Sequence, residues 1–276
     1  MDKRLLTIQD ISCVGQCSLT VALPIISACG IETAILPSSV LSNHTAKGFS
    51  GWTFHDLTDD MPKILDQWKK EKITFDAFYT GYVSKAQIPH ILKIMEESAR
   101  PSALRIVDPV MADNGVLYAG FDKDFPDEMK KLCSVSDVIM PNITEACLLL
   151  KKEYKASGYD KNYIEDLLKE LHDLGPKNVI LTGVSFEEKK LGIAAFDGKE
   201  VKYYFTEKLP VSMHGTGDVY ASSFAGALLR GKTLFDSACI AADFVCECIK
   251  KTLGDSDHWY GVKFEKALPY LIGRLS

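Results

Sequence analysis

Short apolar runs alternate with amphipathic stretches along almost the whole chain. The runs expected to form strands are residues 5–9, 32–36, 75–79, 104–107, 138–140 and 179–181. Between them, apolar residues recur at helical spacing in residues 19–28, 61–70, 86–98, 127–132, 144–150 and 163–174. Alternation of this kind joins parallel strands by right-handed crossovers, and strands this apolar must be covered on both faces. The sequence therefore predicts an α/β fold with a mainly parallel central sheet and helices on both faces.

An antiparallel hairpin is expected at one edge of this sheet. Residues 191–196 and 201–205 are β-type runs joined by the turn Asp197-Gly198-Lys199-Glu200. Helical spacing then returns in residues 216–229, 234–251 and 262–271. No linker, internal repeat or low-complexity segment interrupts this order, so residues 1–276 are interpreted as a single domain.

Composition argues against several classes of partner. The 276 residues carry a formal net charge of -5, so no basic field exists to hold a nucleic acid or an anionic membrane surface. The first apolar run is too short for a secretory signal, and no run approaches transmembrane length. The eight cysteines are sparse and lack zinc-type spacing, which favours free thiols. A cytoplasmic enzyme or binding protein that acts on small molecules is expected.

The segment Gly215-Thr216-Gly217-Asp218 opens a predicted helix that is rich in small residues. Its two glycines permit positive φ and close approach of an anion, and the positive end of the helix points to the same place. Residues 215–217 are therefore a candidate anion hole. A carboxylate repels phosphate, so Asp218 is best explained as a base that takes a proton from an attacking hydroxyl. The alternative is an ordinary glycine turn with Asp218 at a helix start.

Ligands of open α/β sheets bind beyond the carboxyl ends of the strands, and polar residues occur at these positions. Asp10 follows the first predicted strand, where it contacts a substrate or caps the next helix. Asp108 and Asp113 follow the fourth, where two carboxylates suit Mg²⁺ with nucleotide phosphates. The run Asp113-Asn114-Gly115 is also a common turn, so both readings of Asp113 stay open.

Three further polar segments follow predicted strands. His44, after the second strand, is interpreted as a structural histidine without an acid–base role. After the fifth strand, Asn142 or Thr144 could cap a helix with Glu145 near its positive end, or these groups could serve the ligand edge. After the sixth, Thr182 offers a hydroxyl for phosphate or adenine contacts.

Two common nucleotide-binding motifs do not occur in the sequence. There is no GxxxxGK[ST] P-loop, and no GxGxxG follows the first predicted strand, which removes the main reason to expect a dinucleotide cofactor. A carboxylate base, an anion hole and separate carboxylates for Mg²⁺ together describe phosphoryl transfer from a nucleotide to an alcohol.

With these residues assembled, the chain resembles the ribokinase superfamily, and within it the pyridoxal kinases, over essentially its whole length. The GTGD motif is common to the superfamily. The more selective matches are Leu41-Ser42-Asn43-His44-Thr45, Thr80-Gly81-Tyr82, Asp108-Pro109-Val110 with Asp113, and Pro141-Asn142-Ile143-Thr144-Glu145-Ala146. The resemblance implies a ribokinase-like three-layer fold and ATP-dependent phosphorylation of the 5′-hydroxymethyl group of a B6 vitamer with Mg²⁺. It also implies a homodimer; a need for a monovalent cation stays open.

The resemblance further implies a role for each matched residue. Asp218 is the base, and Gly215, Thr216 and Gly217 bind the γ-phosphate. ATP is expected at Asp108, Asp113, Tyr118, Asn142, Glu145, Thr182 and Thr216, with Asp108 and Glu145 holding the metal. The vitamin pocket is expected at Asp10, Thr45 and Tyr82.

Two residues depart from the pyridoxal kinase pattern. Asp10 stands where these kinases usually carry serine, and a carboxylate there favours a protonated ring nitrogen or the aminomethyl cation of pyridoxamine. His214 resembles the hydroxymethylpyrimidine kinases of thiamine synthesis, which are the alternative enzyme, although their glycine-rich loop is absent after the first strand. A non-catalytic vitamer-binding protein is the alternative from another class, and Asp218 argues against it because a binding protein needs no base beside phosphate.

Overall fold

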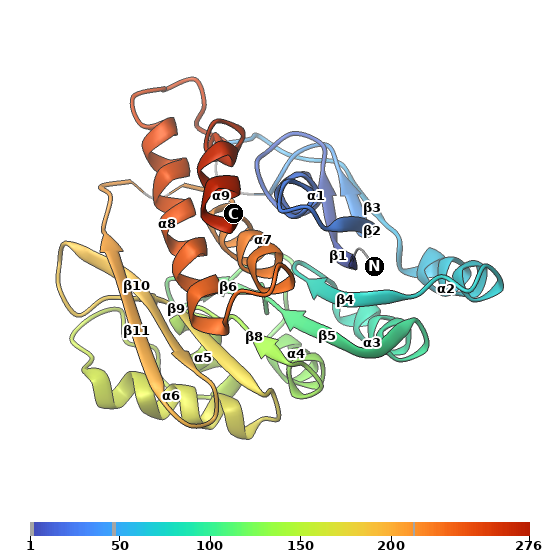
Figure 1. The fold of residues 1–276 in the computed structure, drawn as a ribbon, viewed down its shortest axis with the longest axis horizontal. Coiled ribbons are helices and arrows are strands. Elements are labelled where there is room, and N and C mark those ends of the chain that lie inside the picture. The colour runs from blue at the N-terminus through green and yellow to red at the C-terminus, as the bar shows by residue number, and fades with distance from the viewer. Residues whose placement is uncertain (1–2, 46–47, 212) are drawn as a thin grey trace.

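A computed structural model describes residues 3–45, 48–211 and 213–276 of the chain. Figure 1 shows a twisted central sheet with helices on both of its faces. Within the described ranges, nine strands form this sheet in the order β11-β10-β9-β8-β5-β4-β1-β2-β3. Their bounds are β1 Arg4–Ser12, β2 Glu32–Leu41, β3 Phe54–Asp56, β4 Phe75–Thr80, β5 Ala99–Val107, β8 Val138–Ile139, β9 Asn178–Val184, β10 Lys190–Phe196 and β11 Val201–Glu207. A separate small hairpin is formed by β6 (Ala112–Asp113) and β7 (Val116–Leu117).

The strand pairing confirms the predicted fold class. Strands β2, β1, β4, β5, β8 and β9 pair in parallel, each with its neighbour in the sheet. The hairpin β10–β11 is antiparallel and joins β9 at one edge, as expected. At the other edge, β3 adds antiparallel to β2. Because the central strands are parallel, their carboxyl ends meet at one side of the molecule.

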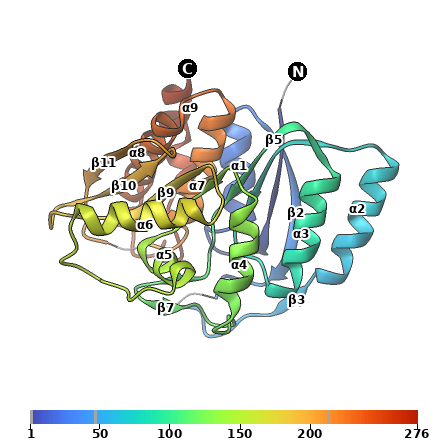
Figure 2. The ribbon, with the colours of Figure 1, turned by 90° about the horizontal axis from the view of Figure 1, so that it is seen from below.

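Two layers of helices cover the sheet, each over its own apolar core (Figures 1 and 2). One layer contains α1 Leu19–Ala28, α7 Thr216–Leu229, α8 Leu234–Thr252 and α9 Leu268–Leu275. The other contains α2 Met61–Lys70, α3 Ile88–Glu97, α4 Phe125–Ser134, α5 Ile143–Leu150 and α6 Lys161–Asp173. Hydrophobic burial on both faces explains why the central strands are almost continuously apolar.

Helix α7 packs closely against its neighbours, and its many small side chains permit this close packing. It contacts both α1 and α8, and the residues from Val219 to Ala227 are buried without exception. Gly226 faces Cys29 so closely that a Cβ at this position would overlap the Cys29 sulfur. Tight packing therefore holds the first turn of α7, which contains Asp218, at a fixed height above the sheet.

Several elements differ from the predicted ones. Strand β3 and the β6–β7 hairpin were not predicted, because two- and three-residue strands carry too little periodic signal. A helix over residues 262–271 is wrong: a 3₁₀ turn, Phe264–Lys266, precedes α9. Pro269 explains the difference, since a proline fits the first turn of α9 but would break the interior of a longer helix.

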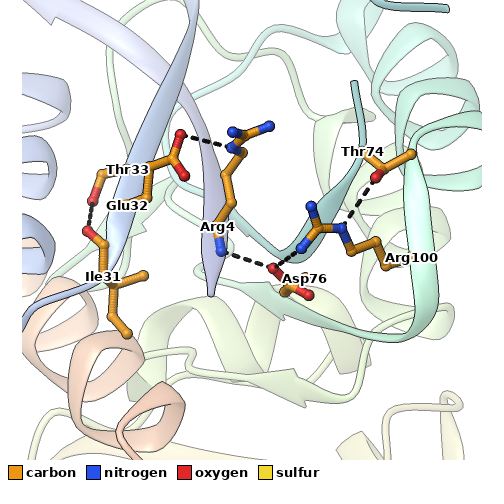
Figure 3. A network of polar contacts seen from close by, with 7 residues as sticks. All are labelled: Arg4, Ile31, Glu32, Thr33, Thr74, Asp76 and Arg100. Atoms are coloured by element: carbon orange, nitrogen blue, oxygen red, sulfur yellow. Dashed lines mark hydrogen bonds and ion pairs between the residues drawn. The ribbon is translucent and has the colours of Figure 1, made fainter. Parts of the chain in front are cut away.

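A polar network ties the amino ends of the strands together (Figure 3). The Asp76 carboxylate accepts hydrogen bonds from the Arg4 backbone N–H and from the Arg100 guanidinium, both at 2.8 Å. Arg4 also pairs with Glu32 at 2.7 Å. These contacts join β1, β2, β4 and β5 at the sheet edge opposite the carboxyl ends.

All eight cysteines are free, and Cys29, Cys133 and Cys147 are buried, whereas Cys13 is exposed. In the part of the chain that the structure describes, no helix combines the length and hydropathy needed to cross a membrane.

Candidate active site

Polar residues from distant parts of the sequence meet at the carboxyl edge of the sheet. In Figure 2 this edge lies at the bottom, near β3 and β7, while both chain ends lie at the top. Asp10 lies within β1 rather than after it, because β1 continues to Ser12. Asp108 follows β5, and Asn142 follows β8. The first turn of α7 brings Asp218 to the same edge, as shown by the electrostatic effect of Asp218 on Asp108.

The GTGD segment forms the turn into α7. Gly215 is the N-cap, with a left-handed φ of 76°, and a Cβ here would overlap the backbone carbonyl oxygen of Gln16. Only glycine fits both constraints. Gly217 does not have the predicted positive φ, because it lies in the first helical turn; a Cβ at Gly217 would have no neighbour within 4 Å. Its missing side chain leaves space beside N–H groups that have no partner within the helix. Thr216 turns its hydroxyl to the Met213 carbonyl oxygen, at 3.2 Å.

Asp218 is half-buried and has the pKa of a base suited to neutral pH. Burial raises the pKa of its carboxyl to about 7, the backbone N–H of Ser18 lowers it, and the nearby charge of Asp10 raises it. A base is most effective when its pKa lies near the working pH. Asp218 can therefore accept a proton from a hydroxyl placed beside the anion hole.

Asp10 is buried, with 5% of its surface exposed, and it is surrounded by hydroxyl groups. Ser12 donates to its Oδ2 atom at 2.8 Å. Burial raises the pKa of Asp10, while the hydroxyls of Ser18 and Ser12, together with His44, lower it. Asp10 does not cap the following helix, since the N-cap of α1 is Ser18.

Asp108 and Glu145 form a second group of carboxylates. Burial and the negative charges of Glu145 and Asp218 raise the pKa of Asp108 well above its usual value. Burial also raises the pKa of Glu145 to about 8, although three backbone N–H groups lower it. Repulsion between carboxylates in one place is relieved by a bound cation.

The two carboxylates differ in how they could hold a metal. Glu145 Oε1 accepts the backbone N–H groups of Met111 (3.0 Å) and Ala112 (3.5 Å), and its Oε2 accepts that of Asn142 (2.9 Å). The Asp108 carboxylate has no hydrogen bond from any residue that the structure describes. Asp108 therefore fits Mg²⁺ as a direct ligand, whereas Glu145 fits as a nearby charge that acts through water.

The capping and turn alternatives are confirmed for three of the predicted ATP residues. Asn142 is the N-cap of α5 and forms a reciprocal capping box with Glu145, and its amide donates to the Ala112 carbonyl oxygen at 2.8 Å. Asp113 is exposed and holds the turn Asn114-Gly115, whose two residues have positive φ. These contacts shape the hairpin β6–β7 beside the carboxylates, which leaves ATP contacts by the same residues as a prediction.

Tyr118 lies outside the central sheet, whereas Thr182 lies within one of its strands. Tyr118 follows β7 and is 42% exposed; burial of its hydroxyl and the charges of Glu145, Asp113 and Asp108 raise its pKa. Thr182 lies inside β9 rather than after it, with its backbone N–H bonded to the Pro141 carbonyl oxygen at 2.9 Å. It stands beside Asn142 in a parallel bridge, so a nucleotide contact is limited to its half-buried side chain.

A cavity of about 340 Å³ opens beyond the ends of β2 and β4, and its lining does not include Asp108, Glu145 or Asp218. It contains the predicted pocket residues Thr45 and Tyr82, but Asp10 is not part of its wall. The charge of Asp10 nevertheless raises the pKa of Tyr82, after the effect of burial. The remaining lining residues are Leu41, Trp52, Phe54, Ser84, Lys85, Ala119, Gly120, Phe121, Asp122 and Phe125.

Sequence reasoning missed the aromatic wall of this cavity. Trp52 and Phe121 lie in irregular segments and Phe54 lies in the three-residue strand β3, so no periodic signal marks them. Three aromatic residues within 49–54 are the signal that could have indicated a binding surface. His44 is structural, as predicted: its Nε2 contacts the Tyr260 carbonyl oxygen at 3.0 Å, and its ring lies 5.0 Å from that of His214.

The sheet, the glycine turn and the half-buried Asp218 carboxyl are features of a phosphotransferase of the ribokinase-like class that acts on small molecules. The sequence profile of the phosphomethylpyrimidine kinases matches residues 54–261. The chain belongs to this family, which is part of the ribokinase superfamily.

Solved structures agree with this assignment. A candidate phosphomethylpyrimidine kinase of Bacteroides thetaiotaomicron, crystallised with pyridoxal, is 38% identical, with 98% of this chain and 96% of that chain covered and a TM-score of 0.92. The pyridoxal kinase of Lactobacillus plantarum is 32% identical, with 98% and 97% covered and a TM-score of 0.90. Among curated relatives, the thiamine biosynthetic bifunctional enzyme of Arabidopsis thaliana is 25% identical over 222 residues. That match covers 75% of this chain and spans 40% of the longer relative.

Proposed function

We propose that this protein transfers the γ-phosphoryl group of ATP to the 5′-hydroxymethyl group of a B6 vitamer. The observation that carries the proposal is the Asp218 carboxyl, whose pKa is about 7, at the mouth of the α7 anion hole. The pyridoxal found with the Bacteroides relative supports the choice of acceptor. A non-catalytic binding protein is disfavoured, because a buried carboxylate beside a phosphate site weakens binding unless it is used as a base.

The chemistry of transfer follows from these groups. The oxygen of the substrate hydroxyl attacks the γ-phosphorus, and Asp218 accepts the proton of that hydroxyl. The bond from phosphorus to the bridging oxygen of ADP breaks, and the bonding electrons leave with ADP. The N–H groups at the start of α7 stabilise the charge on the transferred phosphoryl group. Mg²⁺, when bound, offsets the charge of the phosphates, and Asp108 is the residue placed to hold it.

The cavity fits a single aromatic ring better than a sugar. Its wall contains Trp52, Phe54, Tyr82 and Phe121, and the ring centroids of Tyr82 and Phe121 are 5.1 Å apart. A sugar with several hydroxyls requires many polar partners, whereas apolar and aromatic residues make up most of this wall. Thr45 supplies a hydroxyl at the rim, and Lys85 and Asp122 form a weak ion pair at 3.9 Å.

A second candidate is phosphorylation of hydroxymethylpyrimidine. It is favoured by the family profile and by His214, whose ring lies beside His44 near the start of α7. Burial and the charge of His44 lower the pKa of His214, so the ring is neutral at pH 7 and can accept a hydrogen bond from an aminopyrimidine.

One experiment separates these candidates. Release of ADP is measured in a coupled assay with pyridoxal, pyridoxine, pyridoxamine and hydroxymethylpyrimidine as parallel substrates, and Asp218→Asn is the matched control for contaminating kinases. We expect the highest kcat/KM with a B6 vitamer. A higher kcat/KM with hydroxymethylpyrimidine would replace this proposal by the second candidate. Binding of a vitamer without ADP release would favour the non-catalytic alternative.

A further inference from the structure

Ser18 has a backbone conformation that serine rarely adopts. Its φ is 51° and its ψ is -133°, in a region where glycine is favoured and other residues are strained. The other non-glycine residues with positive φ in the described part of the chain are Lys72, Ser102, Asn114 and Lys151. All four are exposed, whereas Ser18 keeps only 5% of its surface exposed. A buried residue under strain is held in place by the contacts around it.

Helix capping does not explain this conformation. Ser18 is the N-cap of α1, but its side chain makes no capping hydrogen bond to the helix. Only its carbonyl oxygen serves the helix, where it accepts the N–H groups of Val21 (3.0 Å) and Ala22 (2.9 Å). An unstrained N-cap serine uses its hydroxyl for the N–H groups of the first turn. The Ser18 hydroxyl makes no such bond.

The two polar groups of Ser18 act on the two carboxylates of the site. The hydroxyl lowers the pKa of Asp10 on β1, and the backbone N–H lowers the pKa of Asp218 on α7. Ser12 holds Asp10 from the other side at 2.8 Å. Since the charge of Asp10 also acts on Asp218, the two carboxylates are close enough to repel each other. A residue with one donor for each of them reduces this repulsion.

We propose that Ser18 is a positioning residue whose strained backbone holds the base Asp218 and the buried Asp10 together in the geometry that the reaction needs. The inference rests on the proposed role of Asp218 in phosphoryl transfer. The hydroxyl of Ser18 favours the ionised form of Asp10, and the N–H of Ser18 favours the ionised form of Asp218. Strain at this point is the energetic cost of a preorganised site.

A pair of serine-to-glycine variants tests whether the strain serves the reaction. Ser102 also has a positive φ, of 64°, but it is exposed near the amino end of β5, far from the carboxyl edge. Glycine relieves the backbone strain at both positions. Ser18→Gly also removes the hydroxyl, so it should melt no lower than Ser18→Ala, which lacks the same group. We expect Ser18→Gly to lose about tenfold or more in kcat, because the base is no longer fixed, while Ser102→Gly keeps the parent kcat. A Ser18→Gly variant with the parent kcat would overturn the proposal.

The variant Ser18→Ala isolates the hydroxyl and is measured without any substrate. Burial raises the pKa of Asp10, so ionisation of Asp10 lowers stability as pH rises through its folded pKa. Without the hydroxyl, the ionised form is less favourable still. The melting temperature of Ser18→Ala relative to the parent should therefore fall as pH rises through the folded pKa of Asp10. A difference that does not change with pH would show that the hydroxyl does not act on Asp10, whether or not the protein phosphorylates vitamers.

The pH dependence of kcat/KM is a second measurement on Ser18→Ala. If both carboxylates must be ionised for the reaction, the acidic limb of the kcat/KM profile should move to higher pH in Ser18→Ala. A purely structural role would lower the melting temperature at every pH and leave this limb in place. If the parent protein phosphorylates no vitamer, the proposed function fails, and the pH dependence of melting still decides whether Ser18 acts on Asp10.

Discussion

Gly215 lies against the backbone carbonyl oxygen of Gln16, so close that no side chain can be placed between them. This contact joins the start of α7 to the loop after β1, and it places the anion hole and the segment that contains Ser18 next to each other. Gly215→Ala should lose about 1 to 3 kcal/mol of stability from the left-handed backbone alone, with further loss from the overlap with Gln16. Denaturant unfolding measures the change.

Gly217→Ala is the matched control for that substitution. A Cβ at Gly217 meets nothing within 4 Å, and alanine favours a helical turn, so stability should be unchanged or higher. Activity should still fall, because the methyl group occupies the space proposed for the phosphoryl group. Equal loss of stability in both glycine variants would contradict the geometry of this turn.

Replacement of Asp218 should affect the chemical step. Asp218→Asn keeps nearly the same shape but cannot accept a proton, so kcat should fall by about 10²- to 10⁴-fold while vitamer binding changes far less. Because the Asp218 pKa is about 7, the parent kcat/KM should decline as pH falls below neutrality, where the base becomes protonated. Calorimetric affinity beside kcat separates binding from catalysis. A loss of less than tenfold would remove Asp218 from the role of base.

Asp10 should control the choice between vitamers. A buried carboxylate favours a cationic substrate by roughly 1.5 to 3 kcal/mol, so Asp10→Ser should move the kcat/KM ratio about ten- to a hundredfold from pyridoxamine toward pyridoxal. The preference of the parent should fade on acidification, and at a higher pH than for an ordinary aspartate, because burial raises the Asp10 pKa. Asp10→Asn controls for shape. A ratio that is equal in all three proteins would place vitamer choice elsewhere in the cavity.

Asp108 and Glu145 should respond differently to substitution. Asp108→Asn removes a buried charge without breaking a described hydrogen bond, so the melting temperature should rise, while the Mg²⁺ concentration for half-maximal rate increases about tenfold or more. Glu145→Gln places an amide N–H group against backbone donors and should lower the melting temperature. Magnesium titrations with parallel thermal melts make the comparison. Unchanged magnesium dependence in Asp108→Asn would exclude Asp108 as the ligand.

At the opposite edge of the sheet, Asp76 should contribute to stability alone. Burial raises its pKa, but the N–H of Arg4 and the guanidinium of Arg100 lower it more, so the net pKa is below the usual value. A carboxylate with a lowered pKa stabilises the fold above its unfolded pKa of 3.8 and loses this effect as pH falls through its folded pKa. Asp76→Ala should lose about 1 to 2 kcal/mol near neutral pH and less below about pH 4. Unfolding curves at both pH values measure this loss of stability, and kcat should stay unchanged.

The sequence by itself determined the class of fold and most of its elements. Periodic apolar spacing reports burial directly, so α1, α2 and α7 have the bounds that their patterns predict. The GTGD segment predicted a glycine turn at the start of a helix, which Gly215 forms, because glycine has a steric reason to occur there. Elements without periodicity, such as β3 and the β6–β7 hairpin, were not predictable.

Only the tertiary structure decided how the candidate residues act. Strand order places Asp10 on β1 near Asp218 on α7, although most of the chain separates them in sequence. Both Asn142 and Glu145 matched the ligand pattern, yet their side chains hold backbone groups of the hairpin segment and of their own helix cap. A pKa and a strained φ are products of burial and of neighbours brought together by folding. For this reason the Asp218 carboxyl with a pKa of about 7 and the strained backbone of Ser18 exist only in the folded chain.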